Sequence, residues 1–263
     1  MVLLSKRFVI WALFDSGNGS YFKDLEKRSD VEFFSIGIDR ENKNSHFINL
    51  DLSSYTDIFG DSSMFDALDK LPKPDLIIAS PPCESWSNAS AMANGNACWK
   101  QDMMENLFGE MKGSRFSVRE YDDFDGYQFK PYNQIMTRIN GELTIFNTIR
   151  IIKKYEPKYY IIENPAFDRI WEYIDKVLGF DIEFENLTYY SNYGYSIPKP
   201  TKFGSNVYLN LNDKRTLTGE NMNNMGGYNQ RSNIPAPLVE HIFDAILKKK
   251  RREGNENKER IKQ

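Results

Sequence analysis

The chain has 263 residues, and its 40% hydrophobic and 27% charged side chains are typical of a globular protein of one or two domains. This composition excludes wholesale disorder, a collagen-like chain and a mini-protein. The 34 basic and 37 acidic side chains leave a net charge of −3. The molecule therefore has no global positive field, and any contact with nucleic acid must use local patches.

The cysteine and histidine counts and the N-terminal residues narrow the class further. Two cysteines and two histidines are too few for a disulfide scaffold and do not suggest a Cys/His zinc site. No metal is therefore expected, and a reducing cytoplasm fits best. The N-terminal apolar run is broken by Lys6, Arg7 and Asp15 and is far too short to span a membrane. We expect it to be a first buried strand, without attachment to a membrane.

Short apolar runs alternate with segments of helical pattern along most of the chain. The runs that we interpret as strands cover residues 8–15, 32–39, 46–52, 75–80, 159–165 and 206–211. Strands that alternate with helices predict βαβ units. The expected fold class is therefore α/β, with a Rossmann-like, doubly wound and mostly parallel sheet.

Two helices are predicted with particular clarity. The first begins near Gly19 or Ser20, directly after the first strand, and the second covers roughly residues 135–155. In the second helix apolar residues recur at three-residue steps. We expect these residues to face the core: Leu143, Phe146, Ile149, Ile152 and Tyr155.

Two segments depart from this regular alternation. Residues 84–132 are polar and irregular, which favours a long functional insertion over a site. Residues 248–263 hold eight basic and three acidic side chains. They form either a solvated helix end or an arm that contacts phosphates. We therefore divide the chain into a main domain over 1–247, which contains the insertion, and a basic tail over 248–263.

The first three predicted strands end in residues that suit a nucleotide. Phe14, Gly17 and Gly19 lie in the stretch FDSGNG, and a Gly-x-Gly turn between a strand and a helix lets a ligand approach the backbone closely. Asp39 ends the second strand, where a carboxylate would meet ribose hydroxyls, and Asp51 closes the third. Each aspartate could instead be a helix cap or a turn former. Together the three strand ends favour an adenosine-type pocket.

The strongest signal follows the fourth predicted strand. Pro81, Pro82 and Cys83 form a stiff loop that holds one thiol at the carboxyl edge of the sheet. The next strand ends in Glu163 and Asn164, and a carboxyl group beside a pocket can serve as a proton donor. If the two strands are neighbours, the thiol and the carboxyl group flank one cavity. That geometry suits addition of a thiolate to an electron-poor ring while a ring nitrogen is protonated.

In these stretches the chain resembles the cytosine-C5 DNA methyltransferases, which use S-adenosylmethionine. The matching stretches are FDSGNG, Asp39, Asp51, SPPCESWS and IIENP, followed by NYGYSIPKPTKF and RSNIPAPLVEHI, and they span roughly residues 10–245. The related amino-methyltransferases have Asp-Pro-Pro-Tyr at the place of Pro-Pro-Cys. The cysteine therefore favours chemistry at a ring carbon.

The resemblance implies a substrate, a cofactor and a role for each matching residue. The substrate would be a cytosine flipped out of double-stranded DNA. Cys83 would add to C6 of the cytosine, Glu163 would contact N3 and Asn164 would help to fix the loop. The residues implied to hold S-adenosylmethionine are Phe14, Gly17, Gly19, Asp39 and Asp51, with Pro81 lining the cofactor.

The chain also departs from the family. Where the family commonly has Gln-x-Arg-x-Arg, this chain has Lys199-Pro-Thr-Lys202, so that Lys199 and Lys202 are either substrate contacts or surface lysines of a Pro-rich turn. Only about twenty residues separate Leu211 from Arg231, which implies a reduced or absent target-recognition domain. Recognition of a DNA sequence would then come from the 84–132 insertion or from a partner subunit, or would be almost absent.

The resulting hypothesis is a cytoplasmic DNA cytosine-C5 methyltransferase of a mobile genetic element or a restriction-modification system. A cognate restriction enzyme or a specificity subunit is the candidate protein partner. The alternatives are an RNA cytosine-C5 methyltransferase and a catalytically silent module that binds cofactor or nucleic acid. A nicotinamide dehydrogenase is disfavoured, because the last glycine of its fingerprint is missing and it has no use for Pro-Pro-Cys paired with Glu-Asn-Pro.

Overall fold

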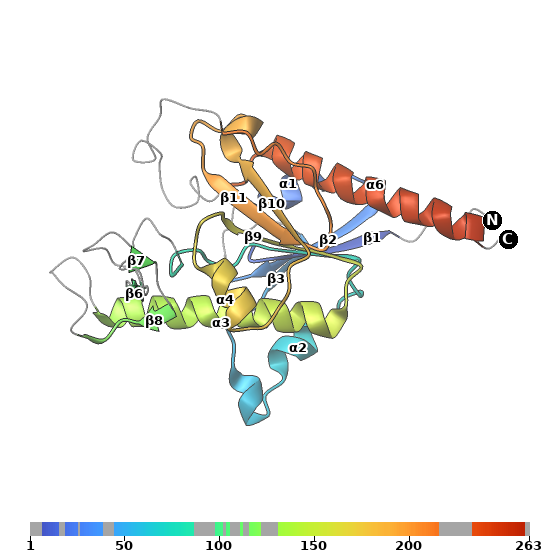
Figure 1. Cartoon of the computed structure of the whole chain (residues 1–263). Coiled ribbons are helices and arrows are strands. Elements are labelled where there is room, and N and C mark those ends of the chain that lie inside the picture. The colour runs from blue at the N-terminus through green and yellow to red at the C-terminus, as the bar shows by residue number, and fades with distance from the viewer. Residues whose placement is uncertain are drawn as a thin grey trace.

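A seven-stranded sheet with helices on both faces forms the centre of the molecule (Figure 1). The computed structural model describes residues 7–15, 19–25, 27–38, 45–86, 98–101, 104–105, 111–112, 116–121, 131–215 and 233–260. Within these residues no helix is long and apolar enough to cross a membrane. The structure establishes the α/β class.

The strands of the sheet lie in the order β10-β11-β9-β4-β1-β2-β3. Their bounds are β1 (Phe8–Leu13), β2 (Val31–Gly37), β3 (Phe47–Asn49), β4 (Leu76–Ala79), β9 (Tyr159–Pro165), β10 (Phe184–Tyr189) and β11 (Pro200–Ser205). The first five are parallel, and β11 runs antiparallel to both of its neighbours. From β1 the chain moves outward through β2 and β3 and then returns to β4 on the other side of β1. Ligands bind at such a switch point, beyond the carboxyl ends of the strands.

Helices cover the two faces of the sheet as separate layers (Figure 1). One face carries α1 (Phe22–Leu25), the 3₁₀ turn η4 (Tyr190–Tyr193) and α6 (Ala236–Arg260). The other face carries α2 (Ser63–Leu68), α3 (Pro131–Tyr155) and α4 (Ile170–Lys176). A further 3₁₀ turn, η1 (Thr56–Phe59), follows β3.

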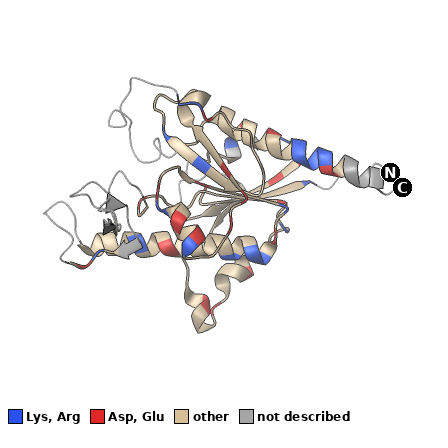
Figure 2. Ribbon diagram, in the orientation of Figure 1, with Lys and Arg blue, Asp and Glu red and all other residues tan. Residues whose placement is uncertain are grey.

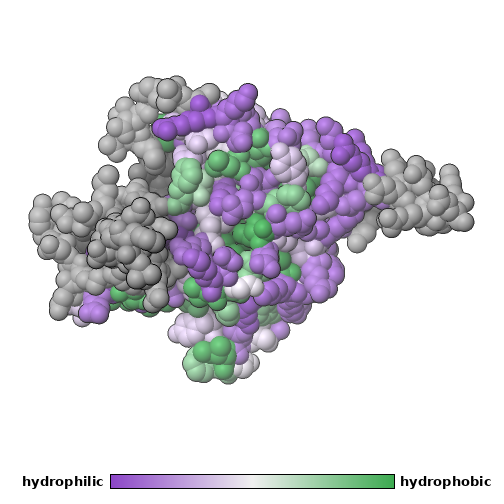
Figure 3. Space-filling model, in the orientation of Figure 1, coloured by the Kyte–Doolittle hydropathy of each residue, from purple (hydrophilic) through white to green (hydrophobic). Residues whose placement is uncertain are grey.

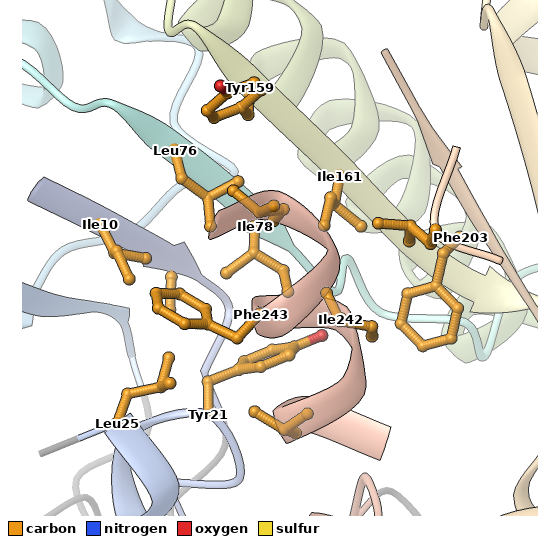
Figure 4. Packing of buried hydrophobic residues seen from close by; sticks show 14 of the residues in the cluster. Ile10, Tyr21, Leu25, Leu76, Ile78, Tyr159, Ile161, Phe203, Ile242 and Phe243 are labelled. Carbon is orange, nitrogen blue, oxygen red and sulfur yellow. The ribbon is translucent and has the colours of Figure 1, made fainter. Parts of the chain in front are cut away.

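The central strand β1 shows why the sheet is buried on both sides. All six of its residues are buried, as expected for a parallel strand with helices on each face. Successive side chains point to opposite faces. Ile10 therefore packs in the cluster under α6, together with Phe243, whereas Trp11 packs in the cluster over α3. Figure 4 shows the first cluster, in which Tyr21 and Ile242 lie between α6 and the strands.

Five of the six predicted strands are confirmed, and the sixth is wrong. Residues 206–211 form no strand, and the strand next to β9 is β11, just before them. Val207 and Leu209 are buried, which explains the misleading apolar alternation. Their backbone groups bond to the side chain of Asn186, whose Nδ2 donates to the Val207 oxygen at 3.1 Å and whose Oδ1 accepts from the Leu209 nitrogen at 2.8 Å.

Helix α3 confirms the second predicted helix and most of its predicted apolar face, since Ile149 and Ile152 are buried and Leu143 and Tyr155 are partly buried. Phe146 is 44% exposed, whereas Thr144 and Asn147 are buried. With 3.6 residues per turn, each three-residue step falls about 60° short of a full turn, so the four steps from Leu143 to Tyr155 drift around the helix. The buried Asn147 amide donates to the carbonyl oxygens of Leu52 and Ser54 at 2.8 and 2.7 Å, which satisfies its hydrogen-bonding groups inside the core.

The insertion over 84–132 contains two small antiparallel sheets in its described part. β5 (Trp99–Gln101) pairs with β8 (Phe116–Val118), and β6 (Met104–Glu105) pairs with β7 (Met111–Lys112). These strands lie at the end of the molecule opposite to the chain termini (Figure 1). The insertion therefore sits beyond the carboxyl ends of the parallel strands, where the candidate site is found.

The basic tail continues helix α6 through to Arg260, so that the proposed boundary at residue 247 lies inside a helix. Lys250 Nζ lies 4.6 Å from the ring centroid of Phe8, and Lys158 forms an ion pair with Glu253 at 2.6 Å. Both contacts are at the amino edge of the sheet. In Figure 2 the ribbon of this part of α6 is blue at its basic residues, near the chain termini and far from the insertion.

Candidate active site

The predicted chemical residues meet at the carboxyl ends of three neighbouring strands. In the register of the sheet, Leu13 of β1 lies beside Ala79 of β4, and Ala79 lies beside Ile162 of β9. The loop with Cys83 therefore leaves β4 next to the position where Glu163 follows Ile162. The condition set by the sequence is met, because β4 and β9 are adjacent and parallel.

Backbone and side-chain hydrogen bonds hold the loop that carries Cys83. The Ser80 nitrogen donates to the Leu13 oxygen at 3.1 Å, and the Trp86 nitrogen donates to the Cys83 oxygen at 3.0 Å. Asn164, which is 1% exposed, donates from Nδ2 to the Pro81 oxygen at 2.8 Å. Pro81 and Pro82 have no backbone N–H and cannot donate hydrogen bonds that would hold the loop. The Asn164 amide supplies a donor from a neighbouring strand instead.

Tight packing against helix α3 also fixes the loop. A Cβ atom on Gly141 would lie 1.9 Å from Ser85 Oγ and 2.8 Å from Ser85 Cβ, so only glycine allows this approach. Trp86 is 1% exposed. Its ring stacks on Trp99 of the insertion, with 5.4 Å between centroids, and contacts Tyr173 of α4 at 4.9 Å. The loop, the insertion and two helices thus share one packed cluster.

The Cys83 thiol is protonated in the resting protein. Burial, followed by the nearby charge of Glu163, raises the pKa of Cys83 to about 12, and the charge of Lys199 opposes this rise. A thiol in this state is a poor nucleophile, because the thiolate is the reactive form. Reaction at Cys83 therefore requires removal of its proton when a substrate is bound.

Glu163 lies among buried tyrosines on the α6 side of the sheet. Its side chain is 8% exposed, and Tyr190 donates from its hydroxyl to Glu163 Oε1 at 3.1 Å. The hydroxyls of Tyr21 and Ser80 share a hydrogen bond of 2.7 Å. Burial, and then the charge of Glu163, raises the pKa of both tyrosines well above 10, so both phenols remain neutral donors.

The two candidate substrate lysines occupy different places. Lys199 has a positive φ of 34°, and its Nζ lies 4.5 Å from the ring centroid of Tyr190. Desolvation lowers the pKa of Lys199, while the charges of Glu163 and Cys83 oppose that change. Lys199 is therefore close to both reacting groups.

Lys202 lies on the other face of the sheet. Its register partner in β9 is Asn164 rather than Glu163. Lys202 Nζ forms an ion pair with Glu185 at 2.9 Å and lies 5.0 Å from the ring centroid of Trp171 in α4. The structure does not bring Lys202 to the group formed by Cys83 and Glu163.

The candidate cofactor residues are only partly described. Gly17 and Asp39 lie outside the described residues. Phe14 and Gly19 adopt positive φ values of 60° and 58°, so the chain turns sharply on either side of the segment between them. Asp51 is exposed and accepts hydrogen bonds from the nitrogen and hydroxyl of Ser53.

Sequence reasoning missed several residues that build the site. Asp15 is 2% exposed at the end of β1, and its Oδ2 accepts a hydrogen bond from Ser35 at 2.7 Å. Tyr190 and Trp86 contact the candidate residues directly but lie in stretches without regular spacing. Gly141 carried the one usable signal, since a lone glycine inside a helical pattern often marks close packing.

Comparisons with known proteins find no family and only distant structural likeness. No protein-family model matches the chain, and no curated protein matches it. A similar solved structure is that of a proposed DNA modification methyltransferase encoded within a prophage of E. coli, with a TM-score of 0.41 and 14% identity. The match covers 76% of this chain and 46% of that chain, so the chain spans less than half of its neighbour. Such a likeness assigns no function, which must be argued from the site.

Proposed function

We propose that this protein is a DNA cytosine-C5 methyltransferase that uses S-adenosylmethionine. One observation carries the proposal: Cys83 follows β4, Glu163 lies near the carboxyl end of the adjacent parallel strand β9, and the two are close enough for the charge of Glu163 to raise the pKa of the thiol. A nucleophile and a proton donor that face one space can attack and protonate the same ring. The resemblance of the surrounding stretches to this family gives the same assignment.

The site residues account for the chemistry on the cytosine ring. The Glu163 carboxylate takes up the proton of Cys83 and passes it to N3 while the sulfur forms a bond to C6. The electron pair of the C5=C6 bond then makes C5 a nucleophile, which takes up the methyl group. Loss of the C5 proton to solvent restores the double bond and expels the sulfur as thiolate, and the proton on N3 then returns through Glu163 to the sulfur, so that Cys83 is again a thiol. Lys199 stabilises this thiolate, since its charge lowers the pKa of Cys83.

The switch point between β1 and β4 is the proposed place of the cofactor. The parallel strands follow the order third, second, first, fourth and fifth, as in doubly wound nucleotide-binding sheets. The positive-φ turn at Phe14 and Gly19 brings backbone close to this point, and Asp15 adds a buried carboxylate there. These features fit a ligand with an adenosine part, and Gly17, Asp39, Asp51 and Pro81 are the further contacts that we propose. When bound, S-adenosylmethionine supplies an electrophilic methyl group.

Double-stranded DNA is the proposed substrate, with the target base flipped out of the helix. C6 cannot be attacked while the base is stacked. The insertion lies at the same edge of the sheet as Cys83 and packs on Trp86 through Trp99. We propose that the insertion contacts the DNA around the flipped base and provides whatever sequence preference the protein has.

Covalent capture tests the proposal directly. The protein is incubated with S-adenosylmethionine and short duplexes that carry 5-fluorocytosine in random sequence contexts. Fluorine cannot leave C5 as a proton does, so the bond between Cys83 and C6 persists and a protein–DNA adduct survives denaturing electrophoresis. Cys83→Ser should abolish the adduct. Cys98→Ser is the matched control, because the buried Cys98 donates to Gln134 instead and the adduct should remain.

The outcomes separate the candidate functions. An adduct that forms only with single-stranded RNA would replace DNA by RNA as the substrate. Folded protein that forms no adduct with either nucleic acid would contradict the proposal and favour a silent binding module.

A further inference from the structure

Tyr190 connects the two parts of the candidate site that carry charge. It is fully buried at the start of η4, and its hydroxyl donates to Glu163 Oε1 at 3.1 Å. The Nζ atom of Lys199 lies 4.5 Å from the centroid of the same ring. A cation at this distance is attracted to the face of the ring. One side chain therefore contacts both the carboxylate and the ammonium.

The backbone holds this arrangement in place. Tyr189 and Pro200 are register partners at the end of the β10–β11 ladder, and the Tyr190 nitrogen donates to the Lys199 oxygen at 3.4 Å. The chain between them thus forms a closed loop with Tyr190 and Lys199 at its base. Strand β11 begins directly after Lys199, and its residue Phe203 is the register partner of Glu163. The pairing of β11 with β9 therefore fixes the position of the lysine relative to the carboxylate.

A phenol on one carboxylate oxygen has a defined chemical effect. It fixes the rotation of the carboxyl group, and it leaves Oε2 as the oxygen that can reach a ring nitrogen. The phenol must remain neutral to do this. Its pKa is raised well above 10, first by burial and then by the charge of Glu163, so it donates at every working pH.

We propose that Tyr190 is the positioning residue of Glu163, and that Lys199, seated on the Tyr190 ring, is the cation of the same unit. This inference rests on the proposed function, because it assumes that Glu163 acts on a cytosine. Tyr190 touches neither the base nor the cofactor in this account. It acts only through the orientation of Glu163.

The first arm of the test is kinetic. Tyr190→Phe removes the hydroxyl and keeps the ring under Lys199. We expect kcat for methyl transfer to fall roughly 10- to 100-fold, the range set by one hydrogen bond to a charged group. KM for DNA and for S-adenosylmethionine should change less than about twofold, because a positioning residue makes no ground-state contact. In a Glu163→Met background, which has no oxygen to accept from Tyr190, the same substitution should have almost no further effect.

Tyr193→Phe is the matched control. Tyr193 lies on the same 3₁₀ turn, but its hydroxyl pairs with His241 Nδ1 at 2.9 Å and not with Glu163. This variant should lose a hydrogen bond of similar kind and keep its kcat. Equal losses of kcat in the two variants would overturn the proposal, because they would show a general effect of loosening the turn.

The second arm does not depend on activity. Thermal denaturation of the wild type, the two single variants and the double variant at Tyr190 and Glu163 measures the coupling of the two side chains. We expect Tyr190→Phe to lower the midpoint by roughly 4–8 °C, and by much less in a Glu163→Met background, which has no oxygen to accept the hydrogen bond. Additive shifts would refute the contact itself. A clear coupling in a wild type that transfers no methyl group would instead refute the proposed function.

Discussion

The approach of Gly141 to Ser85 predicts that a single methyl group on helix α3 disturbs the candidate site. In Gly141→Ala the new Cβ would lie 1.9 Å from Ser85 Oγ, 2.8 Å from Ser85 Cβ and 3.2 Å from Trp86 Nε1. Rotation of the serine relieves the first overlap but not the second, so the backbone of the loop must move. Cys83 lies in the same loop, two residues before Ser85.

Two opposing contributions set the expected change in the free energy of unfolding of Gly141→Ala. Overpacking a well-packed site costs about 1–3 kcal/mol, and replacing a helical glycine by alanine returns up to about 1 kcal/mol. The net loss corresponds to a fall of roughly 2–6 °C in the denaturation midpoint. A displacement of the thiol by about 1 Å is enough to lower methyl transfer about 100-fold.

Two further variants make this prediction specific. Gly254→Ala makes the same substitution in α6, where a Cβ would meet nothing within 4 Å, and it should leave activity unchanged with an equal or higher midpoint. Ser85→Gly removes both overlapping atoms, so the double variant with Gly141→Ala should recover most of the lost activity. Differential scanning fluorimetry and single-turnover methyl transfer measure both effects. A Gly141→Ala variant with wild-type midpoint and rate would refute the packing of the loop on α3.

Three more predictions follow from the site and the charged surface. The rate of alkylation of Cys83 by iodoacetamide, measured by peptide mass spectrometry, should stay low at pH 7–9 and rise toward pH 12. Lys199→Met should lower this rate further, because the cation that lowers the pKa of the thiol is lost. Faster alkylation in the variant would contradict this prediction. Asn164→Ala should cost about 1–3 kcal/mol in chemical denaturation, since a buried loop carbonyl loses its donor, and an unchanged unfolding free energy would refute the bond. Replacing Arg251 and Arg252 by glutamine should leave the slope of log DNA affinity against log salt unchanged, because their neighbours Lys250 and Glu253 contact Phe8 and Lys158 at the edge of the sheet opposite to the thiol; a shallower slope would assign them to phosphates.

The parallel strands and their functional ends could be predicted because burial on both faces leaves a continuous apolar signal. β4 and β9 are examples, and the residue after such a strand necessarily lies at the edge where ligands bind. The β10–β11 pair was harder to find. β10 is an edge strand with alternating burial, and the apolar residues 206–211 gave a stronger false signal beside it.

The side-chain partners could not be predicted from spacing. Lys199 and Lys202 look equivalent in the sequence, but β11 begins at Pro200, and a strand directs each side chain to one face according to its register. Tyr190 is one of several tyrosines between 189 and 195, and its partner Glu163 is far away in sequence. The packing of Trp86 on Trp99 likewise joins a loop to an insertion without periodicity.

The exposed apolar side chains of η1 were also outside the reach of the sequence analysis. Ile58 and Phe59 are 72% and 78% exposed, and the hydrophobic patch at the lower end of Figure 3 lies over this turn. Asp57 in the same turn pairs with Arg150 of α3, which ties the turn to that helix. Apolar side chains are buried only where another element covers them, and the described residues do not cover Ile58 and Phe59.

Base-resolution mapping of 5-methylcytosine tests the central claim most directly. The wild-type chain and Cys83→Ser are expressed in a bacterial host whose genome carries no methylation, and the soluble protein level is matched between them. The account predicts 5-methylcytosine in the wild-type host and none with the variant. A short recurring sequence around the modified cytosines would show that the insertion suffices for specificity. An unmodified genome in the presence of soluble wild-type protein, or equal modification with Cys83→Ser, would contradict the account.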